Sequence, residues 1–193
     1  MRIKKFLVFA LSVITVLSMV ACSSSKENLY TVCINIRDYG KVTLELDGNA
    51  APITVANFVK LVDQGFYDGL TFHRIIDGFM IQGGDPLGDG TGGSDEEIVG
   101  EFASNGINNP ISHTKGTISM ARSRFPNSAS SQFFIMVEDG PFLDGNYAAF
   151  GHVTDGIEIV EKIAKDANPV DDNGTILPED QPIIESIEKI SQN

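Results

Sequence analysis

Beyond residue 29, apolar and polar residues alternate with a period of two in several short runs. The two clearest runs, residues 30–36 and 41–46, are joined through Asp38, Tyr39 and Gly40, which is typical of a β-hairpin. Further short runs with strand character follow at residues 71–75, 79–83, 98–102, 117–121, 132–137, 148–153 and 183–190. This many short strands predicts a mainly β domain.

Two segments follow the helical period instead. Pro52 suits the first turn of a helix and Gly65 suits its end. Between them, apolar residues recur every three to four positions, at Val55, Phe58, Val59 and Val62. A second helix is expected over residues 156–167, where Asp155 and Glu158 have the spacing of a capping box. We therefore expect two helices within one β domain, without internal repeats.

The start of the chain has the composition of a targeting signal. Basic residues are followed by an apolar run, residues 6–20, which is shorter than the run of about 20 residues typical of a transmembrane helix. Ala21 and Cys22 come next, and a cysteine in this place resembles the bacterial lipobox. That resemblance implies that Cys22 receives a diacylglycerol and becomes the new N-terminus. The alternative is an ordinary secretory signal with an incidental cysteine.

This interpretation divides the chain into three parts. Residues 1–21 are a lipoprotein signal peptide, residues 22–29 are a tether that begins with lipidated Cys22, and residues 30–193 are one folded domain. The anchor predicts a protein held at the cell membrane and facing the extracytoplasmic side. Once Cys22 is lipidated, only Cys33 remains, so no disulfide can form, and its place in the apolar run YTVCINI predicts a buried side chain.

Charge excludes some partners. The chain without its first 21 residues keeps all 26 acidic residues but only 11 basic ones, a formal net charge of −15. Such a surface repels nucleic acid and anionic lipid. The lipid, rather than surface charge, is therefore expected to hold the protein at the membrane.

Two sequence blocks carry the candidate chemistry. FHRIIDGFMIQGGD, residues 72–85, places Arg74 among apolar residues, and SQFFIMV occupies residues 131–137. In regular strands, residues two positions apart share a face. This alternation places Phe72 and Arg74 on one face of their strand, and likewise Phe79 with Ile81 and Phe134 with Met136. A cationic donor would then lie beside an apolar surface.

Together with the FLDG block at residues 142–145 and the pair Phe150 and Gly151, these blocks resemble the cyclophilins, which are peptidyl-prolyl cis-trans isomerases. The resemblance extends from about residue 30 to residue 190. It implies a closed, eight-stranded antiparallel barrel with two α-helices over its ends. It also implies a monomeric enzyme, with neither metal nor cofactor, that acts on extended proline-containing segments. Combined with the predicted lipoprotein signal, this predicts that the segments belong to exported proteins. The alternative is a proline-binding holdase or an envelope interaction module, which the intact Arg74 disfavours.

The resemblance also implies the roles of individual residues. Arg74 is the catalytic group, Gln82 orients it, and Gln132 lines the same groove. Phe79, Met80, Phe134 and Leu143 form the proline pocket, while backbone groups around Ala121 and Arg122 pair with the extended peptide. The remaining positions that contact substrate are His73, Phe142 and Tyr147. For His73 a structural or rim role is favoured over acid–base catalysis.

Three positions depart from the pattern of many eukaryotic cyclophilins. Phe142 replaces tryptophan, Tyr147 replaces histidine and Arg122 replaces asparagine. The first exchange removes an indole N–H, so cyclosporin should bind with reduced affinity.

Other signals carry less weight. Gly88, Gly90 and Gly93 fit G-x-G-x-x-G, but acidic residues 95–97 would repel a pyrophosphate. The three histidines are far apart in the sequence, without the spacing of metal ligands. His113 lies outside the motifs, and we expect its substitution to change binding and turnover little.

Overall fold

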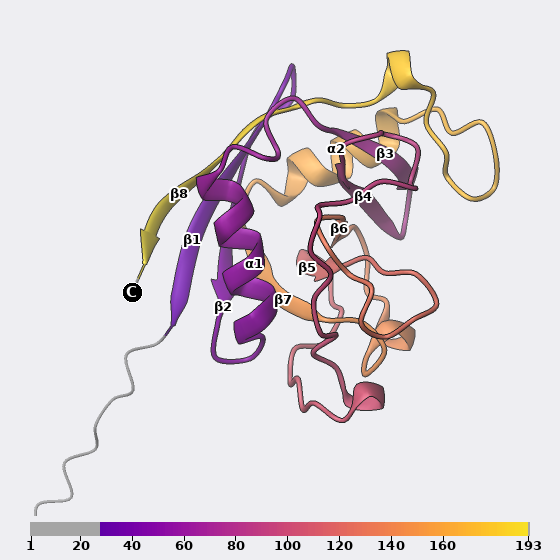
Figure 1. Ribbon diagram of the computed structural model, residues 1–193. Helices are drawn as coiled ribbons and strands as arrows, with labels where there is room; N and C mark the ends of the chain where they lie inside the picture. Colours follow the sequence, from indigo (N-terminus) through magenta and orange to yellow (C-terminus); the bar gives the residue numbers. More distant parts are fainter. Residues whose placement is uncertain (1–27, 193) are drawn as a thin grey trace, which may run out of the picture.

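The computed structural model describes residues 28–192 (Figure 1). The predicted signal peptide and Cys22 lie outside these residues. The strands are β1 (Leu29–Ile36), β2 (Gly40–Asp47), β3 (Thr71–Ile76), β4 (Met80–Asp85), β5 (Thr117–Met120), β6 (Phe133–Met136), β7 (Ala149–Asp155) and β8 (Ile184–Gln192), and the helices are α1 (Pro52–Asp63) and α2 (Ile157–Asp166). Within the described part of the chain, neither helix has the length and apolar character needed to cross a membrane.

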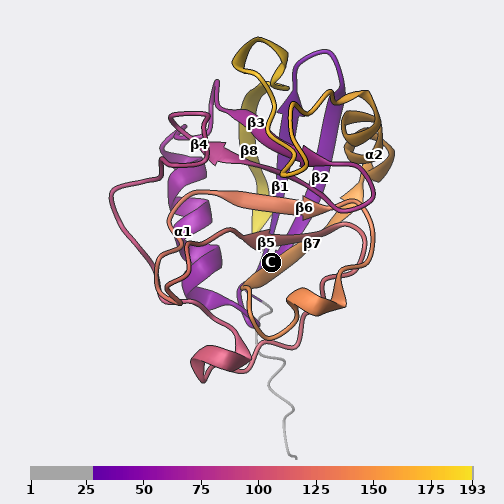
Figure 2. The ribbon, with the colours of Figure 1, turned by 90° about the vertical axis from the view of Figure 1, so that its right-hand side faces the viewer.

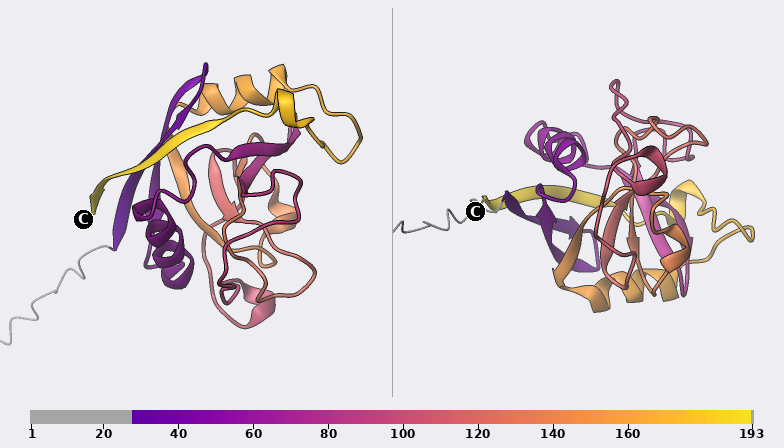
Figure 3. Two further views of the ribbon diagram at one scale, coloured as in Figure 1. Left: turned by 45° about the horizontal axis from the view of Figure 1, so that its top comes forward. Right: turned by 90° about the horizontal axis from the view of Figure 1, so that it is seen from below.

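All eight strands belong to one antiparallel sheet, in the order β3-β4-β6-β5-β7-β2-β1-β8. The sheet curls, and α1 and α2 lie on opposite sides of it (Figure 2). The first and last strands, β1 and β8, run side by side, with Tyr30 paired to Gln192 (Figure 3). The predicted mainly β fold with two helices is therefore present.

The expected closure of the barrel is not confirmed, because the sheet is open between β3 and β8. In the described residues, β3 forms isolated bridges to the segment that precedes β8, from Thr71 to Ile183 and from Arg74 to Thr175. Phe72 donates its N–H to Pro182 O at 3.0 Å, but Pro182 has no N–H with which to continue a ladder. The structure is a curled half-barrel.

The strand expected at residues 98–102 is absent. Ile98 forms only one bridge, to Ala129, and the chain then turns so that Glu101 faces the start of α1. Glu101 is 2 % exposed, and its carboxylate accepts the N–H groups of Ile53 at 3.0 Å and Thr54 at 2.7 Å. A residue distant in sequence thus supplies the N-terminal cap that Ala51 cannot provide.

The predicted capping box of the second helix is also wrong. The N-cap of α2 is Gly156, and no side chain caps it. Gly156 has a φ of +87°, and a Cβ atom there would lie 2.5 Å from the carbonyl oxygen of Lys41. A glycine is required because β2 passes this close to the helix start.

Side chains on the two faces of β6 separate into two apolar clusters. Phe133 and Ile135 point into the main core, where Phe133 meets Phe58 edge-on at 5.5 Å between ring centroids. Phe134 and Met136 point to the other face, as the alternation predicts, and form a smaller cluster with Met80 and Leu143. Cys33 is buried, as predicted. The smaller cluster is the base of the candidate site.

Candidate active site

A β-bulge at His73 determines where Arg74 lies. In the pairing of β3 with β4, Phe72 is opposite Gly83 and Arg74 is opposite Gln82, so one extra residue is accommodated between them. The bulge reverses the simple alternation. Phe72 is fully buried in the main core, whereas Arg74 lies on the other face, and the prediction that these two residues share a face is wrong.

The prediction that Phe79 and Ile81 share a face is also wrong. Phe79 lies in the turn before β4 and packs against the smaller cluster, while Ile81 is part of the main core. Residues in a turn do not follow strand alternation. Both corrections bring the functional groups together, because Arg74 and Phe79 now face the same hollow.

The guanidinium of Arg74 is held at two of its nitrogens. Nε donates to the carbonyl oxygen of Asn173 at 2.8 Å, and Nη1 donates to Oε1 of Gln82 at 3.2 Å. Burial lowers the pKa of Arg74 from its ordinary value, but an arginine side chain remains charged in proteins. The Asn173 contact has no sequence signal, since it is made by a backbone carbonyl in a turn far along the chain.

Gln82 and Gln132 continue this set of hydrogen bonds. Nε2 of Gln82 donates to Oε1 of Gln132 at 2.9 Å, and Nε2 of Gln132 donates to the carbonyl oxygen of Gly92 at 2.8 Å. Each amide is thereby fixed in one orientation. The predicted orienting role of Gln82 has a geometric basis, because its oxygen faces Arg74 while its nitrogen is engaged elsewhere.

The residues named for the proline pocket surround an apolar hollow of about 230 Å³. Met80, Phe134 and Leu143 are buried and form its inner surface, while Phe79 is partly exposed at its edge. The full lining is Arg74, Phe79, Met80, Gln82, Ala121, Arg122, Phe134, Leu143 and Tyr147. Two guanidinium groups therefore lie at the rim of the apolar hollow, Arg74 beside Gln82 and Arg122 bonded to the carbonyl oxygen of Asn146.

Aromatic contacts define the remaining edges of the apolar hollow. Tyr147 meets Phe134 edge-on at 5.9 Å, and the guanidinium of Arg122 lies over the Tyr147 ring at 4.6 Å. Phe142 does not line the hollow. Its side chain is 69 % exposed and its ring lies 5.6 Å from that of Phe79, which places it on the outer rim.

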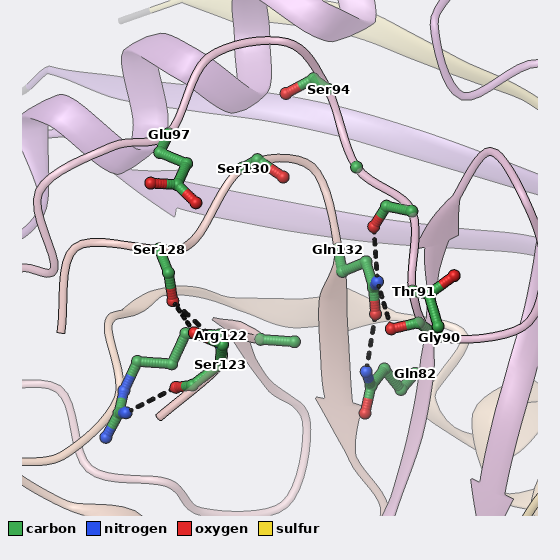
Figure 4. Close-up of a pocket in the computed structure, with 13 residues that line it drawn as sticks. Gln82, Gly90, Thr91, Ser94, Glu97, Arg122, Ser123, Ser128, Ser130 and Gln132 are labelled. Carbon is green, nitrogen blue, oxygen red and sulfur yellow. Dashed lines mark hydrogen bonds between the residues drawn. The ribbon is translucent and has the colours of Figure 1, made fainter. Parts of the chain in front are cut away.

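A second, more polar hollow of about 370 Å³ adjoins the first (Figure 4). The two share Gln82, Ala121 and Arg122. The polar hollow is lined further by the glycine-rich loop and by hydroxyl and carboxylate groups, at Gly90, Thr91, Gly92, Gly93, Ser94, Glu97, Ser123, Ser128, Ser130 and Gln132. Because they share three lining residues, the two hollows form one continuous groove.

The G-x-G-x-x-G stretch forms one wall of the polar hollow. The buried carboxylate of Asp85 accepts the N–H groups of Leu87 at 2.8 Å and Gly90 at 2.6 Å. The carbonyl of Gly92 is turned toward Gln132. Loop N–H groups that could have met a phosphate are therefore bonded within the loop, and a carbonyl faces the groove.

His73 lies away from both hollows. Its side chain is 4 % exposed and packs near Gly90, behind the glycine-rich loop, and it lines neither hollow. Burial lowers the pKa of its imidazole. His73, which was predicted to contact substrate, is therefore buried behind the glycine-rich loop and outside the lining of both hollows.

His113, which was expected to have no part in the site, lies directly behind it. Its ring stacks on that of Phe134, with centroids 6.0 Å apart and an interplanar angle of 17°. Nδ1 lies 2.8 Å from Oδ1 of Asp144. The two residues are 31 positions apart, and neither the histidine nor the aspartate has a neighbouring pattern that predicts the pair.

Comparison with known proteins identifies the family. Residues 31–189 match the family model for the cyclophilin type peptidyl-prolyl cis-trans isomerase/CLD. A probable peptidyl-prolyl cis-trans isomerase of Brucella suis is 44% identical over 174 residues, which cover 87% of this chain and 86% of that protein. Peptidyl-prolyl cis-trans isomerase B of Bacillus subtilis is 46% identical over 129 residues, covering 67% of this chain and 87% of the relative.

Solved structures agree with these sequence relatives. A cyclophilin type peptidyl-prolyl cis-trans isomerase of Cryptosporidium parvum is 34% identical, with a TM-score of 0.71, and the match covers 83% of this chain and 99% of that one. That protein was crystallised in the presence of the dipeptide Ala-Pro. Because the family match spans nearly all of the described sheet and both helices, this chain belongs to the cyclophilins and is a peptidyl-prolyl cis-trans isomerase.

Proposed function

We propose that this isomerase accelerates rotation about X–Pro bonds in exported proteins, outside the cytoplasmic membrane. The C–N bond before proline has partial double-bond character, with a barrier of roughly 18–20 kcal/mol, so uncatalysed rotation takes tens to hundreds of seconds. Exported proteins fold after translocation, and a rotation this slow can limit that folding.

The apolar hollow suits the proline ring, and Arg74 suits the reacting amide. As the C–N bond twists, its nitrogen loses resonance and becomes a hydrogen-bond acceptor. Within residues 28–192, Nε and Nη1 of Arg74 have protein acceptors while Nη2 has none, so donor capacity is left for the substrate. A donor that is already fixed needs little reorganisation. Lowering the barrier by about 7 kcal/mol corresponds to about 10⁵-fold in rate.

The substrate would lie in the groove as an extended chain. Ala121 follows the end of β5 and still donates its N–H to Gln132 O at 3.0 Å. Beyond it the chain leaves the sheet, so backbone near Ala121 and Arg122 can pair with a peptide much as an added strand does. An extended peptide with proline in the apolar hollow would pass its preceding residues along the polar one.

The extracytoplasmic location is proposed from the sequence. Basic residues, a short apolar run and Cys22 have the order of a lipoprotein signal. A single acyl chain gives only marginal anchoring, whereas the diacylglycerol expected on Cys22 carries two. Mass spectrometry of the membrane fraction tests this proposal, with Cys22→Ser as the matched variant. We expect a diacylglycerol mass on wild-type Cys22 and none on the variant. An unmodified wild-type protein in the soluble fraction would contradict the anchor.

The orientation of Arg74 by Gln82 above the apolar hollow is the observation that carries the proposed function. A refolding assay tests whether the protein assists folding by catalysis and not by binding alone. A proline-limited exported protein should refold faster with wild type than with Arg74→Ala at equal occupancy. If wild type raised the refolding yield but gave the same refolding rate as a sample without the isomerase, the domain would act as a holdase.

A further inference from the structure

His113 supports the inner surface of the apolar hollow from behind. Its side chain is 1 % exposed. It stacks nearly parallel to Phe134, which forms the floor of the hollow. The position of the Phe134 ring therefore depends on where the imidazole lies.

His113 also holds both ends of the short 3-10 turn Pro141–Leu143. At the start of the turn, Gly140 donates its N–H to the backbone oxygen of His113 at 2.8 Å. At its end, Oδ1 of Asp144 accepts the backbone N–H of His113 at 2.7 Å and lies 2.8 Å from Nδ1. This turn carries Leu143 into the hollow, so two sides of the hollow are tied to one histidine.

The hydrogen bonds select one form of the imidazole. Burial alone would raise the pKa of Asp144, but hydrogen bonds from His113 and Ser112 outweigh it and lower that pKa, so the carboxylate is ionised and can only accept. Nδ1 of His113 must then carry a proton. Nε2, which is 2.9 Å from Oγ of Ser119, accepts from that hydroxyl. Burial lowers the pKa of His113, which keeps the ring neutral near pH 7.

We propose that His113, through its bonds to Asp144, is a positioning residue that sets the shape of the apolar hollow for the proline ring. This inference rests on the proposed seating of proline in that hollow. His113 does not touch the substrate. Its effect is transmitted by Phe134, through stacking, and by Leu143, through the turn that Asp144 ends.

The ring contacts can be removed separately. His113→Phe keeps a flat ring for stacking but cannot make either ring hydrogen bond. Asp144→Asn keeps an oxygen that can accept from the His113 backbone and ring, whereas Asp144→Ala removes it. Peptide affinity and exchange rate at saturation are measured by NMR titration of the full domain with a proline tetrapeptide.

We expect His113→Phe to raise the Kd of the peptide by about tenfold, while the exchange rate at saturation changes less than about threefold. Asp144→Asn should stay within about threefold of the wild-type Kd, and Asp144→Ala should resemble His113→Phe. The double variant should be no weaker than either single one, because the two residues act as a unit. If His113→Phe fails to fold, Asp144→Ala, at a half-buried position, carries the same test.

Tyr67→Phe is the matched control, because it too keeps a ring while removing buried hydrogen bonding, in this case the single bond from the hydroxyl to Ser131 O at 3.1 Å. Tyr67 lies in the main core and lines neither hollow. We expect it to lower the thermal midpoint without changing the Kd. A folded His113→Phe with the wild-type Kd, or an equal loss of affinity in Tyr67→Phe, would overturn the proposal.

Failure of the proposed function would look different. It would appear as normal turnover in Arg74→Ala, which leaves His113 untouched. The positioning role has its own readout in the free protein, where His113→Phe should shift the methyl resonances of Leu143 and Met80. Unchanged methyl resonances together with an unchanged Kd would contradict positioning, whatever Arg74 does.

Discussion

Arg74 and Gln82 lie opposite each other on neighbouring strands, and Nη1 of the arginine donates to Oε1 of the glutamine at 3.2 Å. This pairing exists because the bulge at His73 brings Arg74 onto the face of Gln82. Gln82 is itself fixed by Gln132, so the guanidinium has a prepared position before any peptide arrives. The pair links strand register directly to the proposed chemistry.

Removal of the Gln82 amide should reduce catalysis without removing the cation. Gln82→Leu keeps much of the side-chain volume but leaves Nη1 of Arg74 without this acceptor. We expect kcat/KM to fall by about tenfold, because a less ordered guanidinium stabilises the twisted amide less well. A protease-coupled assay on a proline tetrapeptide measures the change. Wild-type activity in Gln82→Leu would show that Asn173 alone orients Arg74.

Loss of the Glu101 carboxylate should destabilise the domain. Glu101→Ala leaves the N–H groups of Ile53 and Thr54 and the Thr54 hydroxyl without their acceptor. We expect the free energy of unfolding to fall by about 2–3 kcal/mol, as for other buried caps and unsatisfied polar groups. Urea unfolding measures this. The exposed Glu97→Ala is the control, and equal stability of the two variants would contradict the tertiary cap.

Acid should destabilise the fold through its buried histidines. Burial lowers the pKa of both His73 and His113 in the folded state, so below about pH 6.5 the unfolded chain binds more protons than the folded one. The free energy of unfolding should therefore fall as the pH is lowered from 7 through 6.5 toward 5. Urea titrations across this range should give a smaller slope in His113→Phe. An identical slope in that variant would mean that His113 does not titrate differently in the two states.

Cyclosporin should inhibit this protein, but more weakly than it inhibits a cyclophilin with tryptophan at this position. Phe142 is exposed at the rim and offers a flat ring without an N–H donor. One such hydrogen bond is worth about 0.5–1.5 kcal/mol, which is several-fold to about tenfold in affinity. Phe142→Trp should recover most of that difference with little change in turnover. Equal cyclosporin affinity of wild type and Phe142→Trp in a direct titration would show that Tyr147 or Arg122 determines that affinity instead.

Much of the fold follows from local pattern. The hairpin of β1 and β2 and the alternation of β6 were predicted, because each strand has one face in the main core and its apolar residues repeat accordingly. Residues 98–102 also have an apolar pattern, but they do not form a strand, because the side chain of Glu101 turns toward the start of α1 and caps it. That contact joins positions more than forty residues apart, so no local window contains it.

The site was predictable as a set of residues and less so as a geometry. The family motifs identified Arg74, Gln82 and the residues around the apolar hollow. They did not predict that His73 forms a bulge, since backbone register depends on both strands. The pair of His113 and Asp144 was missed for a similar reason, because only the folded chain brings the histidine behind Phe134.

The specificity constant of Arg74→Ala tests the central claim most directly. The protease-coupled assay on a proline tetrapeptide gives kcat/KM, and circular dichroism with thermal unfolding verifies that the variant is folded. We expect a loss of at least about 10²-fold, equivalent to about 2.7 kcal/mol of transition-state stabilisation, with the fold retained. A well-folded Arg74→Ala with near-normal kcat/KM would contradict the assignment of Arg74 as the catalytic group.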